Sequence, residues 1–174
     1  MQNETLQEVI LNAKMYAMDK KHTELAPHHV LYSLVVTESD VQPILLEYGF
    51  TAKNLDIDER GRGGVLVESD EYVAMKNMAH FICTTVGDTE INCKHVLLAI
   101  ICSGKTYASG KIKYVLKDKD DTKVKQLYQR VKKTIPNNEL LDKYLESDDG
   151  TKMPHLDEKH LTEFEYTAPS YVAD

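Results

Sequence analysis

The sequence predicts an all-α protein built from two tandem four-helix repeats that are related by a pseudo-twofold axis. The first observation is internal similarity: TELAPHHVLYSL at residues 23–34 lines up with TEINCKHVLLAI at residues 89–100, an offset of 66 residues. The second is that the same offset aligns an apolar stripe of helical spacing upstream of each stretch. The third is that both stretches end in nearly all-apolar runs, as in helices buried on most sides. One duplicated helical unit accounts for all three observations.

Each repeat is predicted to begin with an amphipathic helix, roughly at residues 4–19 and 70–85. The apolar stripe has the same helical spacing in both copies. The aligned pairs are Leu6 with Tyr72, Val9 with Met75, Ala13 with Ala79, Tyr16 with Ile82 and Ala17 with Cys83. Ala13 and Ala79 are small and lie in the middle of the stripe, so we expect each to let a second helix approach closely.

The second helix of each repeat is the apolar one, and a different residue marks its start in each copy. Pro27 suits a first helical position because its φ is fixed, whereas Asn92 is a good N-cap. Third helices are predicted in VQPILLEYGF and SGKIKYVL, with Gly49 as the stop of the first. The two third helices are matched through Ile44 with Ile112 and Leu46 with Tyr114.

The fourth helices are predicted to be unequal, a short one near residues 51–58 and a longer one near 120–133. The longer one has apolar residues at helical spacing, namely Val124, Leu127, Tyr128 and Val131. Between the repeats, the glycines and charges of DERGRGGVLVESD mark a linker, in which VLV is expected to add a short extended piece.

These elements give a domain organisation for the whole chain of 174 residues. We expect a double-repeat domain at residues 1–136, with repeat one at about 4–58, a linker at about 59–69 and repeat two at about 70–133. Residues 137–174 are expected to hold one more helix, in NNELLDKYLES, followed by an acidic flexible tail.

Composition is that of an ordinary globular protein and narrows the function classes. The net charge is −7, from 21 Lys and Arg against 28 Asp and Glu, which argues against general nucleic-acid binding. Residues 111–133 are nevertheless basic, so a nucleic-acid-binding helical regulator stays open as an alternative to a solvated helix face.

No signal peptide or membrane segment is recognisable, so we expect a cytoplasmic protein without a membrane partner. The odd number of cysteines fits reduced thiols.

The stretch AIICSGKT at residues 99–106 has the spacing of a relaxed phosphate-binding loop, which suggests a nucleotide-binding enzyme. Such a loop follows a strand, because its glycine amides curl around phosphates between a strand and a helix. Here Ala99 falls within a predicted buried helix. We therefore interpret Gly104, Lys105 and Thr106 as a helix stop and the loop beyond it.

The two repeats, their order and the linker resemble the paired repeats at the N-terminus of Clp-type AAA+ unfoldases. The resemblance covers residues 4–133 and lies in the mid-helix alanines, in the Thr-Glu-Leu and Thr-Glu-Ile loops, and in HHVLYSL and KHVLLAI. It implies a monomeric, non-catalytic, cofactor-free module that captures protein substrates or adaptor proteins for an ATPase ring, which unfolds them and often passes them to a protease.

The ATPase modules of that family are not recognisable in the chain, so we expect no enzymatic activity from it alone. LDEKHLTEFEYTAP at residues 156–169 is similar to the segment by which the family enters its first ATPase module. Two alternatives stay open: the front end of a larger unfoldase, or a free-standing accessory or adaptor protein of a Clp protease complex.

Two positions are predicted to contact the bound partner, His28 and Lys94, which precede the motif histidines and are expected to be exposed. The family commonly has glutamate there, and in some members the two glutamates bind the guanidinium of phosphoarginine. Histidine and lysine do not pair with a guanidinium as a carboxylate does, so we expect phosphoarginine recognition to be lost or weak.

The motif histidines themselves, His29 and His95, suggest a catalytic or ligand role because histidine titrates near neutrality. Each falls in the first turn of a helix, where packing or a bond to the preceding loop explains it equally well, so we interpret both as structural. A zinc site is the alternative for the cysteines and histidines of repeat two. That set comprises His80, Cys83, Cys93, His95 and Cys102. It lacks a Cys-x-x-Cys knuckle, so we predict buried side chains and no metal.

Overall fold

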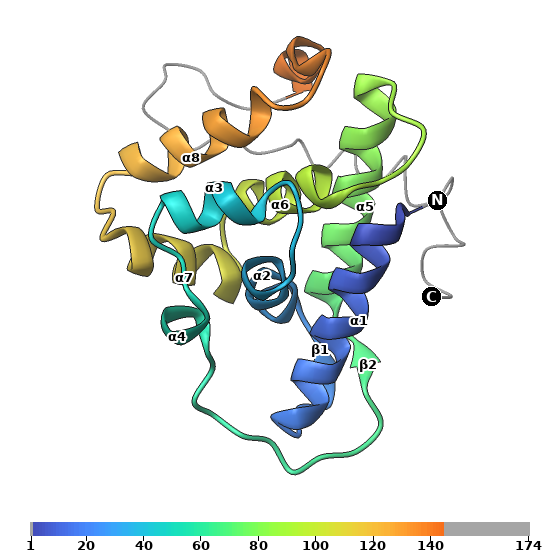
Figure 1. Cartoon of the computed structure of the whole chain (residues 1–174), viewed down its shortest axis with the longest axis vertical. Coiled ribbons are helices and arrows are strands. Elements are labelled where there is room, and N and C mark those ends of the chain that lie inside the picture. The colour runs from blue at the N-terminus through green and yellow to red at the C-terminus, as the bar shows by residue number, and fades with distance from the viewer. Residues whose placement is uncertain (1, 145–174) are drawn as a thin grey trace.

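The computed structural model describes residues 2–144, and these form two successive sets of four α-helices (Figure 1). The first set comprises α1 (Glu4–Asp19), α2 (Pro27–Val36), α3 (Gln42–Glu47) and α4 (Ala52–Leu55). The second comprises α5 (Asp70–Val86), α6 (Cys93–Cys102), α7 (Tyr107–Leu116) and α8 (Thr122–Lys132). The all-α prediction of two four-helix repeats is confirmed, and we call the two sets repeat one and repeat two.

The first helices begin at matching caps in the two repeats. The Asn3 side chain accepts a hydrogen bond from the backbone N–H of Leu6 at 2.8 Å, and the Ser69 hydroxyl accepts one from Tyr72 at 3.1 Å. Each cap satisfies a backbone donor that has no partner within its own helix. The second helices begin as predicted, with Pro27 as the first residue of α2 and Asn92 capping α6.

Glycines in the left-handed conformation follow α3 and α5. Gly49 has φ +90° and Gly87 has φ +82°, values that a side chain with a Cβ adopts only with strain. The residue after each glycine donates its N–H back into the helix, Phe50 to Leu45 and Asp88 to Cys83, both at 3.0 Å. The helix stop predicted at Gly49 is confirmed.

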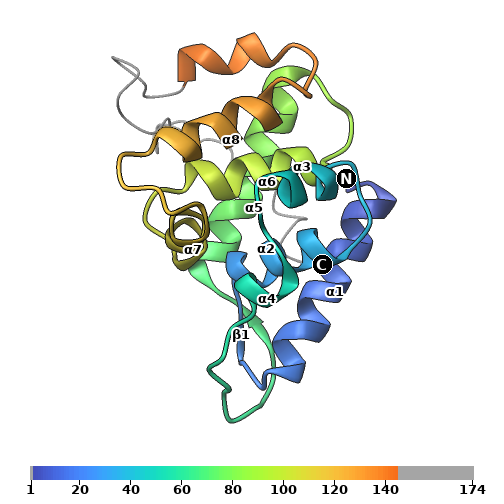
Figure 2. The same ribbon diagram turned by 60° about the vertical axis from the view of Figure 1, so that its left-hand side comes forward.

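The apolar second helices lie at the centre of the core. Every residue of α6 except Lys94 is buried. α1 packs on α2, α5 packs on α6, and α7 and α8 cover α6 (Figure 2). All the predicted stripe positions of α1 and α5 are buried except Tyr16, which is half-buried.

The two repeats exchange short extended segments. β1 (Glu24–Leu25) pairs in parallel with β2 (Val67–Glu68), the piece immediately before α5. In the same way, an isolated parallel bridge joins Gln2, before α1, to Ile91 of repeat two. The extended piece expected in the linker is therefore present, displaced to the end of VLV.

These pairings obey the 66-residue offset found in the sequence. Ser69 donates its N–H to the carbonyl of Leu25, and Asn3 donates its own to Ile91, both at 3.0 Å. Each repeat thus gives the segment that precedes its first helix to the other repeat, as a pseudo-twofold relation requires.

Some boundaries differ from the predictions for identifiable reasons. α7 begins at Tyr107, two residues early, because the Thr106 hydroxyl accepts the N–H of Ser109 and caps it there. α4 is a single turn. The helix expected in NNELLDKYLES is a 3-10 helix, η1 (Asn138–Tyr144), and the predicted acidic tail at residues 145–174 lies outside the described residues. Within residues 2–144, no helix has the length and apolar character to cross a membrane.

Close packing at the mid-stripe alanines is testable by enlargement. Ala13 and Ala79 are at most 1% exposed, so Ala13→Leu and Ala79→Leu should each lower the free energy of unfolding by about 1–3 kcal/mol, the usual cost of overpacking a core. Urea denaturation measures this. Leu11→Ala, at a position 57% exposed on α1, should stay within about 0.5 kcal/mol of the parent chain. Equal effects at all three positions would contradict the packing.

Candidate functional site

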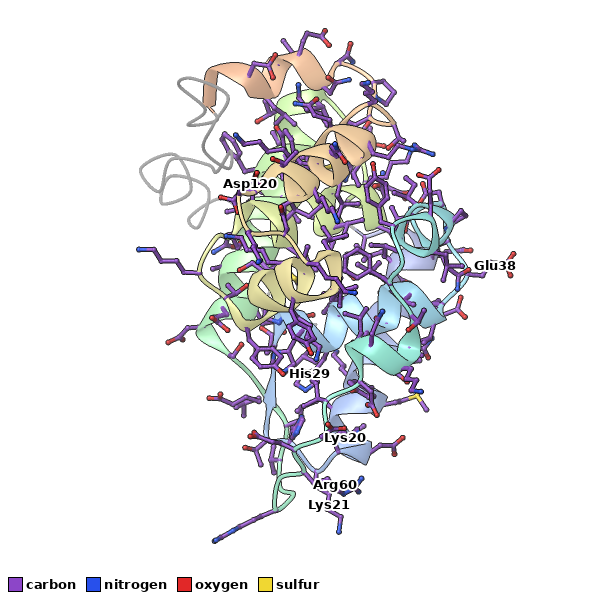
Figure 3. All side chains as sticks on the ribbon, turned by 90° about the vertical axis from the view of Figure 1, so that its left-hand side faces the viewer. Lys20, Lys21, His29, Glu38, Arg60 and Asp120 are labelled. Atoms are coloured by element: carbon purple, nitrogen blue, oxygen red, sulfur yellow. The ribbon has the colours of Figure 1, made fainter. Side chains whose placement is uncertain are left out.

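A cleft of about 930 Å³ lies between the start of α2 in repeat one and α7 in repeat two, and we call it the inter-repeat cleft. The α1–β1 loop and residues 56–62 form its other walls. In Figure 3, His29 lies near α7, and Lys20, Lys21 and Arg60 lie together at the far end of the molecule. The lining residues are Lys21, His22, Thr23, Glu24, Ala26, His28, His29, Asp56, Ile57, Asp58, Glu59, Gly61, Arg62, Ser69, Glu71, Tyr107 and Lys111.

A chain of hydrogen bonds through two histidines builds the floor of this cleft. The Nδ1 atom of His29 accepts the backbone N–H of Ala26 at 3.0 Å, which assigns the ring proton to Nε2. That Nε2–H donates to Nδ1 of His22 at 2.8 Å, and Nε2–H of His22 donates to the carbonyl of Glu59 at 2.8 Å. Both rings are neutral in this arrangement. The chain ties the start of α2 to the linker.

Repeat two contains the equivalent histidine with a different second partner. Nδ1 of His95 accepts the N–H of Asn92 at 3.0 Å, and its Nε2–H donates to a carboxylate oxygen of Asp88 at 2.7 Å. Asp88 stands 66 residues after His22, so the two repeats use the same positions. The structural role predicted for His29 and His95, a bond to the preceding loop, is confirmed.

His28 lies in the cleft and is less exposed than predicted. Its ring meets the ring of Tyr107 edge-on, with centroids 4.8 Å apart, so α7 of the other repeat covers one side of it. The Nδ1 atom is buried and makes no hydrogen bond within residues 2–144. Burial lowers the pKa of His28 to about 4, which keeps the ring neutral at physiological pH.

Lys94 does not join His28, although the two positions correspond between the repeats. Its ammonium donates to the carbonyl of Thr134 at 3.1 Å and lies 3.6 Å from a carboxylate oxygen of Asp40 in repeat one. The side chain is 24% exposed, again less than predicted. Each residue therefore touches the opposite repeat, but the structure does not bring the two into one site.

Tyr16 bonds two residues of the cleft wall, a polar role that its place in the apolar stripe did not predict. Its hydroxyl donates to a carboxylate oxygen of Asp56 at 2.7 Å and accepts the N–H of Ile57 at 2.8 Å. The bond from Tyr16 lowers the pKa of Asp56, and burial raises that of Tyr16 itself. The sequence held one sign of this role: repeat one has a tyrosine where repeat two has the apolar Ile82, and a tyrosine hydroxyl in a covered position needs a polar partner.

The SGKT stretch has the context predicted for a helix stop. Ala99 is buried within α6, so a helix and not a strand precedes Gly104. Gly104 and Lys105 are exposed in the loop that follows, and Thr106 caps α7.

The cysteines of repeat two are buried thiols. Burial raises the pKa of Cys83 to about 11 and those of Cys93 and Cys102 to about 12. Within residues 2–144, no three His, Cys, Asp or Glu side chains gather where they could hold a metal ion.

The basic run at residues 111–133 is partly neutralised by acidic partners. Lys113 pairs with Asp121 at 2.9 Å, and Lys132 pairs with Asp142 at 2.7 Å. Arg130 lies 3.4 Å from a carboxylate oxygen of Glu47 in repeat one. Ion pairs with exposed partners of this kind are typical of a solvated helix face and contribute little to stability.

Comparison with known proteins places this geometry in a family. Residues 1–118 match the Clp repeat (R) N-terminal domain. The Hsp104 N-terminal domain from Candida albicans has a similar fold, with a TM-score of 0.63 and 14% identity over 80% of this chain and 97% of that one. A structure from a malarial protein secretion system has a TM-score of 0.56 and 18% identity, over 77% and 97%. No curated protein sequence matches.

Neutral buried histidines make the stability depend on pH. Burial holds the pKa of His28 at about 4 and that of His29 at about 3, against about 6.5 in an unfolded chain. Below about pH 6.5 the unfolded chain binds more protons, so the free energy of unfolding should fall as the pH drops toward about 4. Urea denaturation at several pH values measures this slope. His28→Phe should make the slope shallower and Lys105→Ala should not; an unchanged slope in His28→Phe would contradict the assignment.

Proposed function

The chain belongs to the Clp repeat N-terminal domain family, and we propose that it binds protein substrates or adaptor proteins for a Clp-type chaperone system. The observation that carries this proposal is the family match over residues 1–118, to which the pseudo-twofold pairing of the repeats adds support. A module of this kind works by binding energy and performs no reaction.

We propose the inter-repeat cleft as the place where an extended polypeptide segment binds. Its volume of about 930 Å³ is of the size that ligand pockets have. The lining carries positive charge on Lys21 and Arg62 and negative charge on Glu24 and Glu71. The cleft can therefore pair with both acidic and basic side chains of a bound segment. Such a mixed lining suits a module that accepts varied sequences.

His28 and Lys94 are the proposed contact residues. His28 supports this role best, because its buried Nδ1 has no partner within the described part of the chain and a hydrogen bond with a peptide group would satisfy it. Lys94 lies outside the cleft, at the equivalent position of repeat two, where its 24% exposure leaves part of the side chain accessible to a partner that extends beyond the cleft.

Moderate affinity is the expected regime for this function. A dissociation constant near 1 µM corresponds to about −8 kcal/mol, which holds a client long enough for transfer and still releases it. Much tighter capture would oppose handing the client on.

Binding of unfolded polypeptide tests the proposal. We expect a fluorescein-labelled, permanently unfolded polypeptide to bind with micromolar affinity in fluorescence anisotropy titrations. His28→Ala and Lys94→Ala should each weaken binding about fivefold to tenfold, or about 1–1.4 kcal/mol. Lys123→Ala, at an exposed lysine on α8, is the matched control and should bind like the parent chain. Circular dichroism verifies folding. Absence of binding up to about 1 mM would refute the proposed function.

Phosphoarginine should bind weakly or not at all, because neither His28 nor Lys94 supplies a carboxylate for the guanidinium. Isothermal titration with free phosphoarginine measures this. His28→Glu should increase the affinity, since it places a carboxylate in the cleft beside Tyr107. Tight binding by the parent chain that His28→Ala and Lys94→Ala abolish would show this expectation to be wrong.

A further inference from the structure

The outer face of α7 carries a second depression, and we call it the α7 groove. It has a volume of about 360 Å³ and is lined by Tyr107, Gly110, Lys111 and Tyr114. Residues at spacings of three, four and seven lie on one side of a helix, so all four share one face. Tyr107 is 53% exposed and Tyr114 is 76% exposed, and Tyr107 and Lys111 also line the inter-repeat cleft. The groove therefore continues from the cleft.

Gly110 has no structural reason to be a glycine. It lies in the interior of α7 and is exposed, and a Cβ added there would meet nothing within 4 Å. Its φ does not lie in the left-handed region, so any L-residue would fit. Glycine weakens a helix interior relative to alanine. The glycine at position 110 leaves the helix backbone uncovered between the two tyrosines. A residue that weakens its own helix without a structural reason is expected at a functional site.

The spacing of the two rings matches one turn of a polyproline II helix. Seven residues of α-helix separate the two tyrosines by about 10 Å along the axis. A polyproline II segment advances about 9 Å in one turn of three residues. Two prolines three positions apart in a bound peptide can therefore lie against the two tyrosine rings. The peptide backbone between the two prolines then passes over Gly110. Aromatic-lined grooves are the surfaces that bind proline-rich segments, because these segments are already extended and lose little entropy.

Charge adds a second requirement for the partner. Lys111 lies between the tyrosines, with its ammonium 5.6 Å from the centroid of the Tyr114 ring, and it forms no ion pair within residues 2–144. Lys105 and Lys117, near the two ends of α7, are exposed. An acidic residue beside the prolines would thus meet a positive surface.

We propose that the α7 groove binds an extended, proline-rich segment of a partner protein that carries an acidic residue next to its prolines. The inference rests on the proposed function, because it assumes that the chain binds proteins, and it names one class of partner and a surface for it. The two surfaces share Tyr107 and Lys111, whereas Gly110 and Tyr114 line the α7 groove and not the cleft, so variants of Gly110 and Tyr114 separate the two sites.

The experiment uses the full chain and a fluorescein-labelled peptide built from repeats of Pro-Pro-Glu. A Gly-Ser-Glu peptide of equal length and charge is the control probe. We expect saturable binding of the proline peptide in anisotropy titrations, at least tenfold tighter than that of the control peptide. Tyr114→Ala and Lys111→Ala should each weaken it at least fivefold, and Lys123→Ala, an exposed lysine on α8, should not.

Gly110→Ala is the decisive variant because stability and binding should change in opposite directions. The substitution should raise the thermal midpoint of unfolding, because alanine favours the helix. It should also weaken binding of the proline peptide at least threefold, because the methyl group covers the floor of the groove. Gly104→Ala, at an exposed glycine with equally open surroundings, should leave binding unchanged.

Two results would overturn the inference. The first is binding of the proline peptide that Gly110→Ala and Tyr114→Ala leave intact, or equal binding of the Gly-Ser-Glu peptide. Equal binding of the two peptides would indicate that the surface attracts acidic peptides without recognising proline. The second is absence of proline-peptide binding up to about 1 mM. If the unfolded polypeptide still binds in that case, the α7 groove is wrong and the proposed function stands. If neither probe binds, both fail.

Discussion

Each repeat gives the extended segment before its first helix to the other repeat, and this exchange fixes how the two halves meet. Ser69 donates to the carbonyl of Leu25 and Asn3 donates to that of Ile91, both at 3.0 Å. The same two residues cap α5 and α1 with their side chains. Because one residue serves both the cap and the exchange, the start of each first helix cannot shift without breaking a contact between repeats. The inter-repeat cleft and the α7 groove depend on that fixed arrangement.

The motif histidines show how one backbone position serves two purposes in a duplicated fold. In both repeats, Nδ1 accepts the N–H of the residue that precedes the second helix. In repeat two the other nitrogen meets Asp88, so the loop is closed by a charge-assisted bond. In repeat one it meets His22, whose second nitrogen reaches the Glu59 carbonyl. Only repeat one therefore anchors the linker through its histidine, and the cleft forms on that side of the molecule.

The surfaces proposed for binding are where the repeats depart from each other. His28 corresponds to Lys94 of repeat two, and its neighbour Tyr107 comes from the opposite repeat. Gly110 and Tyr114 lie on α7, a ten-residue helix whose counterpart α3 has six residues. The longer α7 extends the protein beside the cleft and exposes Tyr107 and Tyr114 there. Divergence between the copies, and not the shared core, thus supplies the chemistry that a partner would meet.

The sequence by itself determined the helices, their order and the duplication, because helical periodicity, caps and glycine stops are local and recur at a fixed offset. It also indicated that the motif histidines bond to the loops before them. Only the tertiary structure decided what lies against His28 and Lys94, since Tyr107, Asp40 and Thr134 are distant in the chain and are brought there by packing of the repeats. For the same reason Tyr16, an apolar stripe position by spacing, turned out to bond Asp56 and Ile57. Periodicity reports which side of a helix is covered, and the packing of distant segments determines what covers it.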